Sequence, residues 1–218
     1  MRMRIVQNAV MVLAVTLLPL SAHAASILPT SYDMLNGNTG SYDYWDQIYN
    51  GVGCVTCDNA PLTGGVGDLT DGIIAANNWF IDEVPAGNGP YVGWTLNPLI
   101  TFNFASGATI NSMTIHVDDS NGAGGVSTPA GIRINGGAFL PIVDPATSTP
   151  LSFTFNGLNV TGSLGLELFR SNAWLFMSEV TFDGDPGQTA VPEPGTLTLL
   201  GTALSGLIAR RRRKTRQA

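Results

Sequence analysis

The segment Ile100-Thr-Phe-Asn-Phe104 alternates large apolar residues with polar ones. Such alternation indicates a half-buried β-strand, because successive side chains of a strand point to opposite faces of the sheet. The same period of two recurs after Pro98, and no long stretch of residues 25–190 repeats apolar residues at the helical period of 3.6. Further alternating runs lie at residues 113–117, 132–134, 151–155, 164–168 and 174–182.

Short polar pairs of the Asn-Gly and Asp-Gly type separate these runs. Such pairs favour turns, because glycine and asparagine tolerate positive φ angles. They occur at residues 121–122, 135–136, 156–157 and 183–184. Many short strands with Gly, Pro and Asn between them predict an all-β fold, an antiparallel β-sandwich or barrel.

The N-terminus has the three parts of a secretory signal peptide. Two arginines precede a mainly apolar run at residues 5–20, and an Ala-His-Ala cleavage site ends at Ala24. We expect signal peptidase to cut between Ala24 and Ala25. A retained N-terminal anchor is the alternative, and in either case residues 1–24 lie outside the folded domain.

The C-terminus carries a second targeting pattern. Val191-Pro192-Glu193-Pro194 precedes an uncharged apolar stretch at residues 196–209, which five consecutive basic residues follow. As one helix the stretch is about 21 Å long at 1.5 Å per residue, shorter than a bilayer core of roughly 30 Å. It therefore spans a membrane only with flanking residues or local thinning, and the basic cluster marks the cytoplasmic side.

The order of motif, short apolar helix and basic cluster resembles the PEP-CTERM sorting signal of exported Gram-negative bacterial proteins. The resemblance implies that an exosortase recognises Pro192-Glu193-Pro194 and removes the tail of an inner-membrane intermediate. The protein then reaches the cell surface or the exopolysaccharide matrix. A plain C-terminal membrane anchor is the alternative. The expected organisation is a signal peptide (1–24), a β-sandwich domain (25–188) and a sorting signal with a transmembrane helix (189–218).

Charge is distributed very unevenly along the chain. The central domain has fifteen acidic residues and only two basic Arg or Lys residues, Arg133 and Arg170. Its net charge is therefore −13, whereas the whole chain carries −6. Such a domain repels nucleic acid phosphates, which argues against a nucleic acid partner. It also repels acidic polysaccharide unless a cation bridges the two, and it suits an exported protein that binds calcium.

Cys54 and Cys57 are the only cysteines and have the spacing C-x-x-C. Glycine, aspartate and asparagine surround them, which predicts a loop, and export favours a local disulfide. Free thiols, a metal role and redox catalysis are the alternatives, although two cysteines alone cannot form a structural zinc site.

Five segments of the central domain resemble the galactose-binding-like, or discoidin, jelly roll. They are an early Asp-Gly in Leu69–Gly72, the pair Asn78-Trp79, the segment Tyr91–Trp94, the hydrophobic strand Ile100–Phe104, and a closing strand with Ser-Glu-Val in Trp174–Phe182. The resemblance runs from about residue 69 to 184 and implies a jelly roll. The terminal cysteine pair of many eukaryotic members is absent.

In calcium-binding members of that family, the Asp of the Asp-Gly segment and a late Glu meet at one ion. The matching residues are Asp71 and Glu179, and calcium takes 6–8 oxygen ligands that include carbonyls and water. The alternative is that Asp71 caps a turn and Glu179 is a surface acid. Residues 118–122 resemble a calcium loop only superficially, because the EF-hand ligand positions fail, and a polar hairpin loop fits them better.

Aromatic residues near loops indicate a lectin-like site. Sugar rings stack on aromatic faces while amides bind hydroxyls, so we expect Trp94, Tyr91 and Asn97 to contact a glycan. The competing interpretation places Trp79 and Trp174 in the core, and for Trp174 we favour the core.

An enzyme is not expected. There is no G-x-S-x-G motif or nucleotide-binding glycine loop, and His116 is the only histidine after the signal peptide. Paired carboxylates of a glycosidase remain an alternative, but fifteen acids always offer some pair. We therefore expect a non-enzymatic exported protein with a carbohydrate-binding-like domain; the alternatives are a secreted polysaccharide hydrolase and a purely structural matrix protein.

Overall fold

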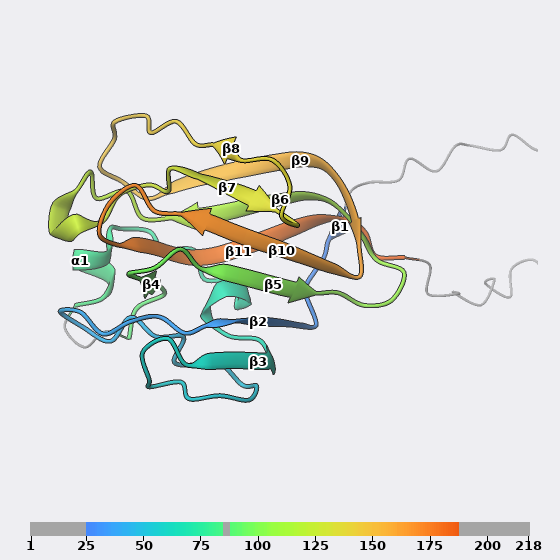
Figure 1. Cartoon of the computed structure of the whole chain (residues 1–218), viewed down its shortest axis with the longest axis horizontal. Helices are drawn as coiled ribbons and strands as arrows, with labels where there is room; N and C mark the ends of the chain where they lie inside the picture. The colour runs from blue at the N-terminus through green and yellow to red at the C-terminus, as the bar shows by residue number, and fades with distance from the viewer. Residues whose placement is uncertain (1–24, 85–87, 188–218) are drawn as a thin grey trace, which may run out of the picture.

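A computed structural model describes residues 25–84 and 88–187, which form two antiparallel β-sheets packed face to face (Figure 1). All strand pairs within the sheets are antiparallel, which confirms the predicted all-β antiparallel sandwich. The only described helices are single turns, namely η1 (Asp68–Thr70), α1 (Trp79–Asp82) and η2 (Ala123–Gly125).

The first sheet has five strands in the order β1-β11-β6-β9, with β4 also paired to β11. Its last strand in sequence, β11, is therefore an interior strand that pairs with three others. The bounds are β1 (Ala25–Ser26), β4 (Val92–Trp94), β6 (Thr109–Val117), β9 (Leu151–Thr161) and β11 (Leu175–Asp185).

The second sheet has six strands in the order β3-β2-β5-β10-β7-β8. Of its two central strands, β5 holds most of the alternating run at residues 100–104, which ends one residue beyond the strand, and β10 includes the run at 164–168. The bounds are β2 (Ser31–Leu35), β3 (Pro61–Gly65), β5 (Leu99–Asn103), β7 (Gly131–Ile134), β8 (Leu140–Pro141) and β10 (Ser163–Phe169).

The main core lies between the sheets and follows the alternation read from the sequence. Ile100 and Phe102 of β5 are fully buried, and their partners across the ladder, Leu166 and Leu164, are fully buried too. Phe182 of β11 closes this layer from the other sheet, with its ring 4.9 Å from that of Phe102. The period-two pattern therefore selects the buried face of each sheet.

Two of the four predicted turns lie within strands instead, where the ladder is irregular. Asn156-Gly157 lies inside β9, where the register shifts between Ile110 and Ser112 of β6. Asp183-Gly184 lies inside β11, opposite a register shift whose extra residue, Asn111, belongs to β6. An extra residue in one strand needs an unusual backbone angle just as a turn does, and Gly157 has a φ of 73°. The pairs at 121–122 and 135–136 do form turns.

The described chain begins and ends at the same end of the sandwich. Ala25 pairs with Gly184 across β1 and β11, and Figure 1 shows β1 beside the last residues of β11, opposite α1 and η2. Among the described residues no helix has the length and hydrophobicity to span a bilayer. The predicted signal peptide, the sorting motif from Val191 to Pro194 and the expected helix at 196–209 lie outside the described residues.

Candidate functional site

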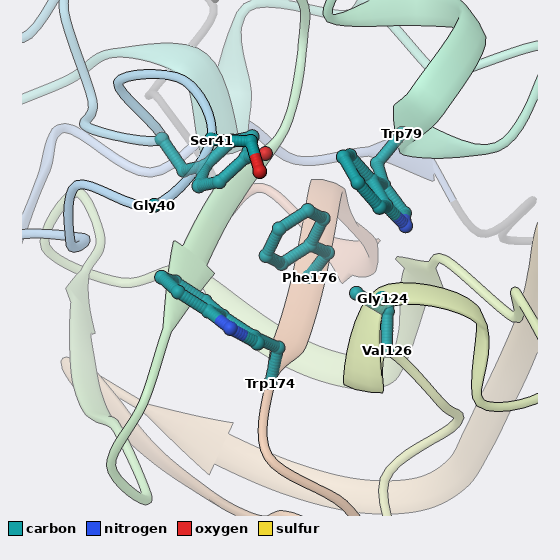
Figure 2. A pocket seen from close by; sticks show the side chains of 8 residues that line it. Gly40, Ser41, Trp79, Gly124, Val126, Trp174 and Phe176 are labelled. Carbon is teal, nitrogen blue, oxygen red and sulfur yellow. The ribbon is translucent and has the colours of Figure 1, made fainter.

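An aromatic pocket of about 290 Å³ lies between α1, η2 and the start of β11 (Figure 2). In Figure 1, α1 lies at the end of the sandwich opposite β1. Segments far apart in the sequence meet there: the loop after β2, the start of α1, η2 and the start of β11. The pocket is lined by Gly40, Ser41, Tyr44, Trp79, Gly124, Val126, Trp174 and Phe176.

Aromatic rings form most of the pocket surface. The Phe176 ring lies between the indoles of Trp79 and Trp174, with centroids 5.8 Å and 5.5 Å away and ring planes at 80° and 81° (Figure 2). Tyr44 packs on Phe176 at 4.6 Å. Phe176 and Tyr44 are buried, while both indoles are only partly buried. The two tryptophans therefore form walls beside a phenylalanine floor.

The polar loop at 118–122 holds Trp79 in place. Asp118 accepts a hydrogen bond from the Trp79 backbone N–H at 2.6 Å, and the Asn78 side chain donates to the Asp119 carbonyl at 2.8 Å. Gly124 makes room for the indole, because a Cβ atom there would lie 2.5 Å from Trp79 Cζ2. This polar loop was expected to close a hairpin, but it leads from β6 of the first sheet to β7 of the second, so the hairpin prediction is wrong. The loop instead supports one pocket wall.

The second wall, Trp174, is held by its backbone and by a glycine. Its N–H donates to the Gly125 carbonyl at 2.9 Å. A Cβ on Gly40 would lie 2.8 Å from the Tyr44 ring and 3.0 Å from the Trp174 ring, so only glycine fits between them. Glycines at 40 and 124 therefore set the width of the pocket.

The polar side-chain groups of the pocket include two hydroxyls and an indole N–H. Ser41 and Tyr44 supply the side-chain hydroxyls of its lining, and burial raises the pKa of Tyr44 to about 12, although a hydrogen bond with Ser41 opposes the rise. The indole N–H of Trp79 is buried and has no hydrogen-bond partner among the described residues. The lining can therefore bind an apolar or ring-shaped surface by stacking, with little hydrogen bonding.

The three residues expected to contact a glycan lie elsewhere. Trp94 is fully buried and donates its indole N–H to the Leu35 carbonyl at 2.9 Å. Tyr91 is 1% exposed and donates to the Asn77 carbonyl. Asn97 is exposed, but it accepts a bond from the Arg170 N–H and does not line the pocket. The rings of Trp94 and Tyr91 are thus part of the packed interior, and the expected core residue Trp174 is a pocket wall.

Asp71 and Glu179 meet at one turn despite their separation in the sequence. The Glu179 carboxylate accepts a hydrogen bond from the Gly72 N–H at 3.1 Å, while Asp71 accepts one from the Ile73 N–H at 2.8 Å. Glu179 is only 2% exposed, and its burial raises its pKa to about 8, with the Asp71 charge adding to the rise. The sequence-based pairing is therefore matched in space, and Asp71 also caps its own turn.

A buried acidic pair beside this turn was not predicted from the sequence. Asp46 accepts hydrogen bonds from the Tyr32 hydroxyl and from the Asp68 N–H, and Asp68 accepts one from the Gln47 N–H. Burial and the neighbouring Asp46 charge raise the pKa of Asp68 to about 8. These carboxyl groups bind the loop after β2 to η1.

The part of the chain that the structure describes contains neither a cluster of three metal-binding side chains nor a complete hydrolase triad. No three His, Cys, Asp or Glu side chains gather there in a metal-binding arrangement. His116 Nδ1 lies 2.7 Å from Ser152 Oγ on the outside of the first sheet, but its Nε2 has no hydrogen-bond partner among the described residues. A Ser-His pair without an orienting acid does not form the triad of a hydrolase.

Cys54 and Cys57 form a disulfide in an exposed loop.

Comparison with known proteins identifies the C-terminal segment. Residues 190–214 match the family model described as the PEP-CTERM protein-sorting motif. The chain therefore carries an exosortase sorting signal, which implies export and a membrane-associated intermediate before surface localisation.

The folded domain has more distant similarities. No curated protein matches the chain. Among solved structures, a chain of the Streptococcus pneumoniae beta-galactosidase BgaA is similar, with 13% identity and a TM-score of 0.40 over 73% of this chain and 98% of that chain.

Proposed function

We propose that the protein is a non-enzymatic protein of the cell surface or exopolysaccharide matrix, and that its galactose-binding-like domain binds a neutral glycan in the aromatic pocket. The observation that carries the proposal is the pair of partly exposed indoles, Trp79 and Trp174, beside the Phe176 ring. Two indole walls of this kind offer stacking surfaces to the apolar faces of a sugar ring.

Charge narrows the class of glycan. Arg133 and Arg170 are the only basic residues between positions 25 and 190, and neither lines the pocket. Arg133 pairs with Glu167 and stacks on the Phe169 ring. A polysaccharide rich in carboxylates would meet a domain of the same sign without a basic partner, so we expect a neutral polymer.

The test compares two tryptophan variants of the mature protein purified from its exporting host. Trp174→Ala removes a pocket wall and should abolish binding on a glycan array. Trp45→Ala is the matched control, because Trp45 lies outside the pocket lining and donates to Asp58. Circular dichroism and thermal melting check that both variants fold.

Each possible outcome distinguishes the proposal from one alternative. Absence of glycan binding by the wild type overturns the proposal in favour of a purely structural matrix protein. Equal loss in both variants means that the pocket is not the binding site. Release of reducing sugar from matrix polysaccharide, lost in a Glu or Asp variant, would establish the hydrolase.

Removal of the C-terminal tail is a separate part of the proposal. We expect Pro192→Ala with Glu193→Ala to block exosortase, so that the mature protein keeps the residues that follow the motif. The intact mass of protein from the native host measures this directly. A variant whose mature mass differs from the wild type only by the two substitutions contradicts exosortase recognition at this motif.

A calcium ion at Asp71 and Glu179 is the last part of the proposal. A buried carboxylate at position 179 beside a second acid favours a cation, and a hard cation accepts carbonyl and water oxygens in addition. Among the described residues no third acidic, histidine or cysteine ligand joins the pair, so the remaining ligands have to be carbonyls and water.

Calcium that binds only the folded state raises stability by about 2.7 kcal/mol at a hundredfold excess over Kd. We expect the melting temperature to rise in millimolar calcium, to rise less in magnesium and to fall with chelator. Asp71→Asn and Glu179→Gln should remove the calcium response and still fold. Identical melts in calcium and chelator would leave Asp71 as a turn cap and Glu179 as a buried acid.

A further inference from the structure

The strand β9 is a long open edge of the first sheet. Within the described residues it pairs only with β6, so the backbone N–H and C=O groups that point away from β6 have no ladder partner. The strand has 11 residues, and none of them is charged or a proline. A row of free backbone groups of this length is a template on which another strand can pair.

The other edge strands of the two sheets are short or covered. Two residues make up each of β1 and β8, and three make up β4. The strand β3 has five residues, but it begins with Pro61, and Val52 exchanges two backbone hydrogen bonds with Thr63 along its outer side. Short strands, proline and covering loops all protect an edge from pairing. In the part of the chain that the structure describes, β9 is thus the long edge that lacks such protection.

The side chains of β9 are also incompletely covered. The neighbouring strand β6 has its apolar residues at most 1% exposed, whereas the five apolar residues of β9 pack against the same core and stay only partly buried. These five are Leu151, Phe153, Phe155, Leu158 and Val160. Figure 1 shows β9 at the margin of the sandwich opposite β3. A strand added beside β9 would cover this row and gain the hydrophobic stabilisation that a single domain leaves unused.

Charge favours a second copy of this domain as the source of the added strand. The net charge of −13 means that two copies repel each other wherever their acids meet. Residues 145–166 contain no charged side chain, so two copies can approach along β9 without bringing acids together. A basic partner, in contrast, would be attracted to the acidic remainder of the surface and not to this neutral edge.

The first half of β9 suits antiparallel pairing with itself. The register with β6 is regular from Leu151 to Asn156, and it is irregular between Asn156 and Val160. A two-fold axis at Phe153 would place this residue opposite its own copy, with residues 151 and 152 opposite 155 and 154. Apolar side chains then lie beside apolar ones and polar beside polar. The irregular second half bends the strand, which confines the pairing to the first half.

We propose that two copies of the mature protein pair through residues 151–155 of β9, antiparallel about a two-fold axis, so that their first sheets form one continuous sheet. Each domain offers one such edge and the pairing occupies it, so assembly stops at the dimer. The inference does not depend on glycan binding, because the pocket is formed by other segments.

The test places like charges across the proposed axis. Ser152 and Thr154 are exposed, and the pairing puts each of them opposite the other residue of the second copy. One variant carries Ser152→Asp with Thr154→Asp, and a second carries Ser152→Lys with Thr154→Lys. The matched control is Thr63→Asp with Ser163→Asp, two exposed residues of the second sheet. Analytical ultracentrifugation at low salt measures the dimer Kd, and circular dichroism with thermal melting checks folding.

We expect the wild type and the control to form dimers with similar Kd values. Each charged variant should dimerise at least about a hundredfold more weakly, because like charges face each other across the axis. An equimolar mixture of the acidic and the basic variant should form a heterodimer, since each carboxylate then faces an ammonium group. A wild type that stays monomeric, a dimer that both charged variants retain, or a mixture that stays monomeric would overturn the inference.

A measurement on the wild type alone covers the case in which a charged variant does not fold. Hydrogen exchange at low and high protein concentration should show slower exchange of the amides of residues 151–155 at high concentration, with no change in β3. Protection of residues 151–155 that is independent of concentration would mean that another segment of the same chain covers the edge, which overturns the inference. Species larger than a dimer would also overturn it.

Discussion

Two apolar clusters in this domain are built in different ways. The main core lies between the two sheets and takes its side chains from regular strands such as β5, β10 and β11. The second cluster, at the loop end, joins Tyr44, Ala75, Tyr91, Val126 and Phe176, with Trp79 and Trp174 packed against it. Phe176 is the one member of these seven that comes from an alternating strand position and lies opposite the main core.

The difference shows how one strand serves two purposes. Along β11 the residues Leu175, Met177, Val180 and Phe182 belong to the main core, whereas Phe176 belongs to the loop-end cluster. The loops cover Phe176 with aromatic rings and leave a pocket between them. A strand position that faces away from the sandwich thus becomes the floor of a site, because loops from three segments reach over it.

The largest effect is expected in the main core. Phe102→Ala removes a fully buried ring that contacts Phe182 and Tyr32, so it should lower the free energy of unfolding by about 3–5 kcal/mol. Urea denaturation of the mature protein measures the loss. A loss below about 1 kcal/mol would show that the sheets do not pack at this position as described.

A second effect is expected from pH, through the buried acids that support the loop end. A carboxyl group whose pKa rises on folding, as that of Asp68 does from 3.8 to about 8, binds its proton more tightly in the folded state. Stability should therefore fall as pH rises from about 4 to about 8. Glu179, with a pKa of about 8, contributes with the same sign.

Asp68→Asn should reduce this fall, because the amide stays neutral and its oxygen can still accept from the Gln47 N–H. Urea midpoints at pH 4, 6 and 8 in chelator measure the slope, and Asp144→Asn in an exposed loop is the matched control. If the urea midpoint changes with pH by the same amount in Asp68→Asn and Asp144→Asn, Asp68 is not the group that binds the proton.

The disulfide should contribute less than the main core. Cys54 and Cys57 close a loop of only a few residues, so replacing both with serine should cost less than the ~3 kcal/mol expected for a 15-residue loop. Alkylation of exported protein without reduction should find no free thiol. Quantitative labelling of both cysteines would contradict the bond.

The smallest change in stability is expected at a pocket wall. Trp174→Ala removes a ring as large as any in the core, but the indole is only partly buried, so we expect about 1–2 kcal/mol, below the 3–5 kcal/mol of a buried ring. Urea denaturation of Trp174→Ala and Phe102→Ala under the same conditions compares the two losses of stability directly. Equal losses in the two variants would make the loop-end cluster a structural core instead of a ligand site.

The sequence predicts the main core well and the loop-end cluster poorly, for a physical reason. Alternation identifies Ile100, Phe102 and Phe182 as buried because a strand fixes which face each side chain takes. Whether Trp94 or Trp174 reaches solvent depends instead on which loops cross above them. Trp94, in β4, is covered by the Leu35 segment, while Trp174 is left at an opening.

Local signals for turns and for capping were also ambiguous. Asn-Gly at 156–157 marks an unusual backbone angle equally well in a turn or in a bulge, and the structure has the bulge. The pairing of Asp71 with Glu179 came from a family resemblance and not from spacing, because 107 residues separate the Gly72 N–H from its Glu179 acceptor. Nothing in the sequence near Asp46 or Asp68 marks them as buried partners.

The interior position of β11 has a mechanical consequence. This strand leads at its C-terminal end toward the sorting signal, and it is hydrogen-bonded along its length to β6 on one side and to β1 and β4 on the other. Ladder bonds run across the strands, so tension applied along β11 loads them in shear, many at once, instead of opening them one after another. The same strand begins beside Trp174 at the opposite end, so a pull applied at its C-terminal end is resisted by the whole sheet before it reaches the pocket.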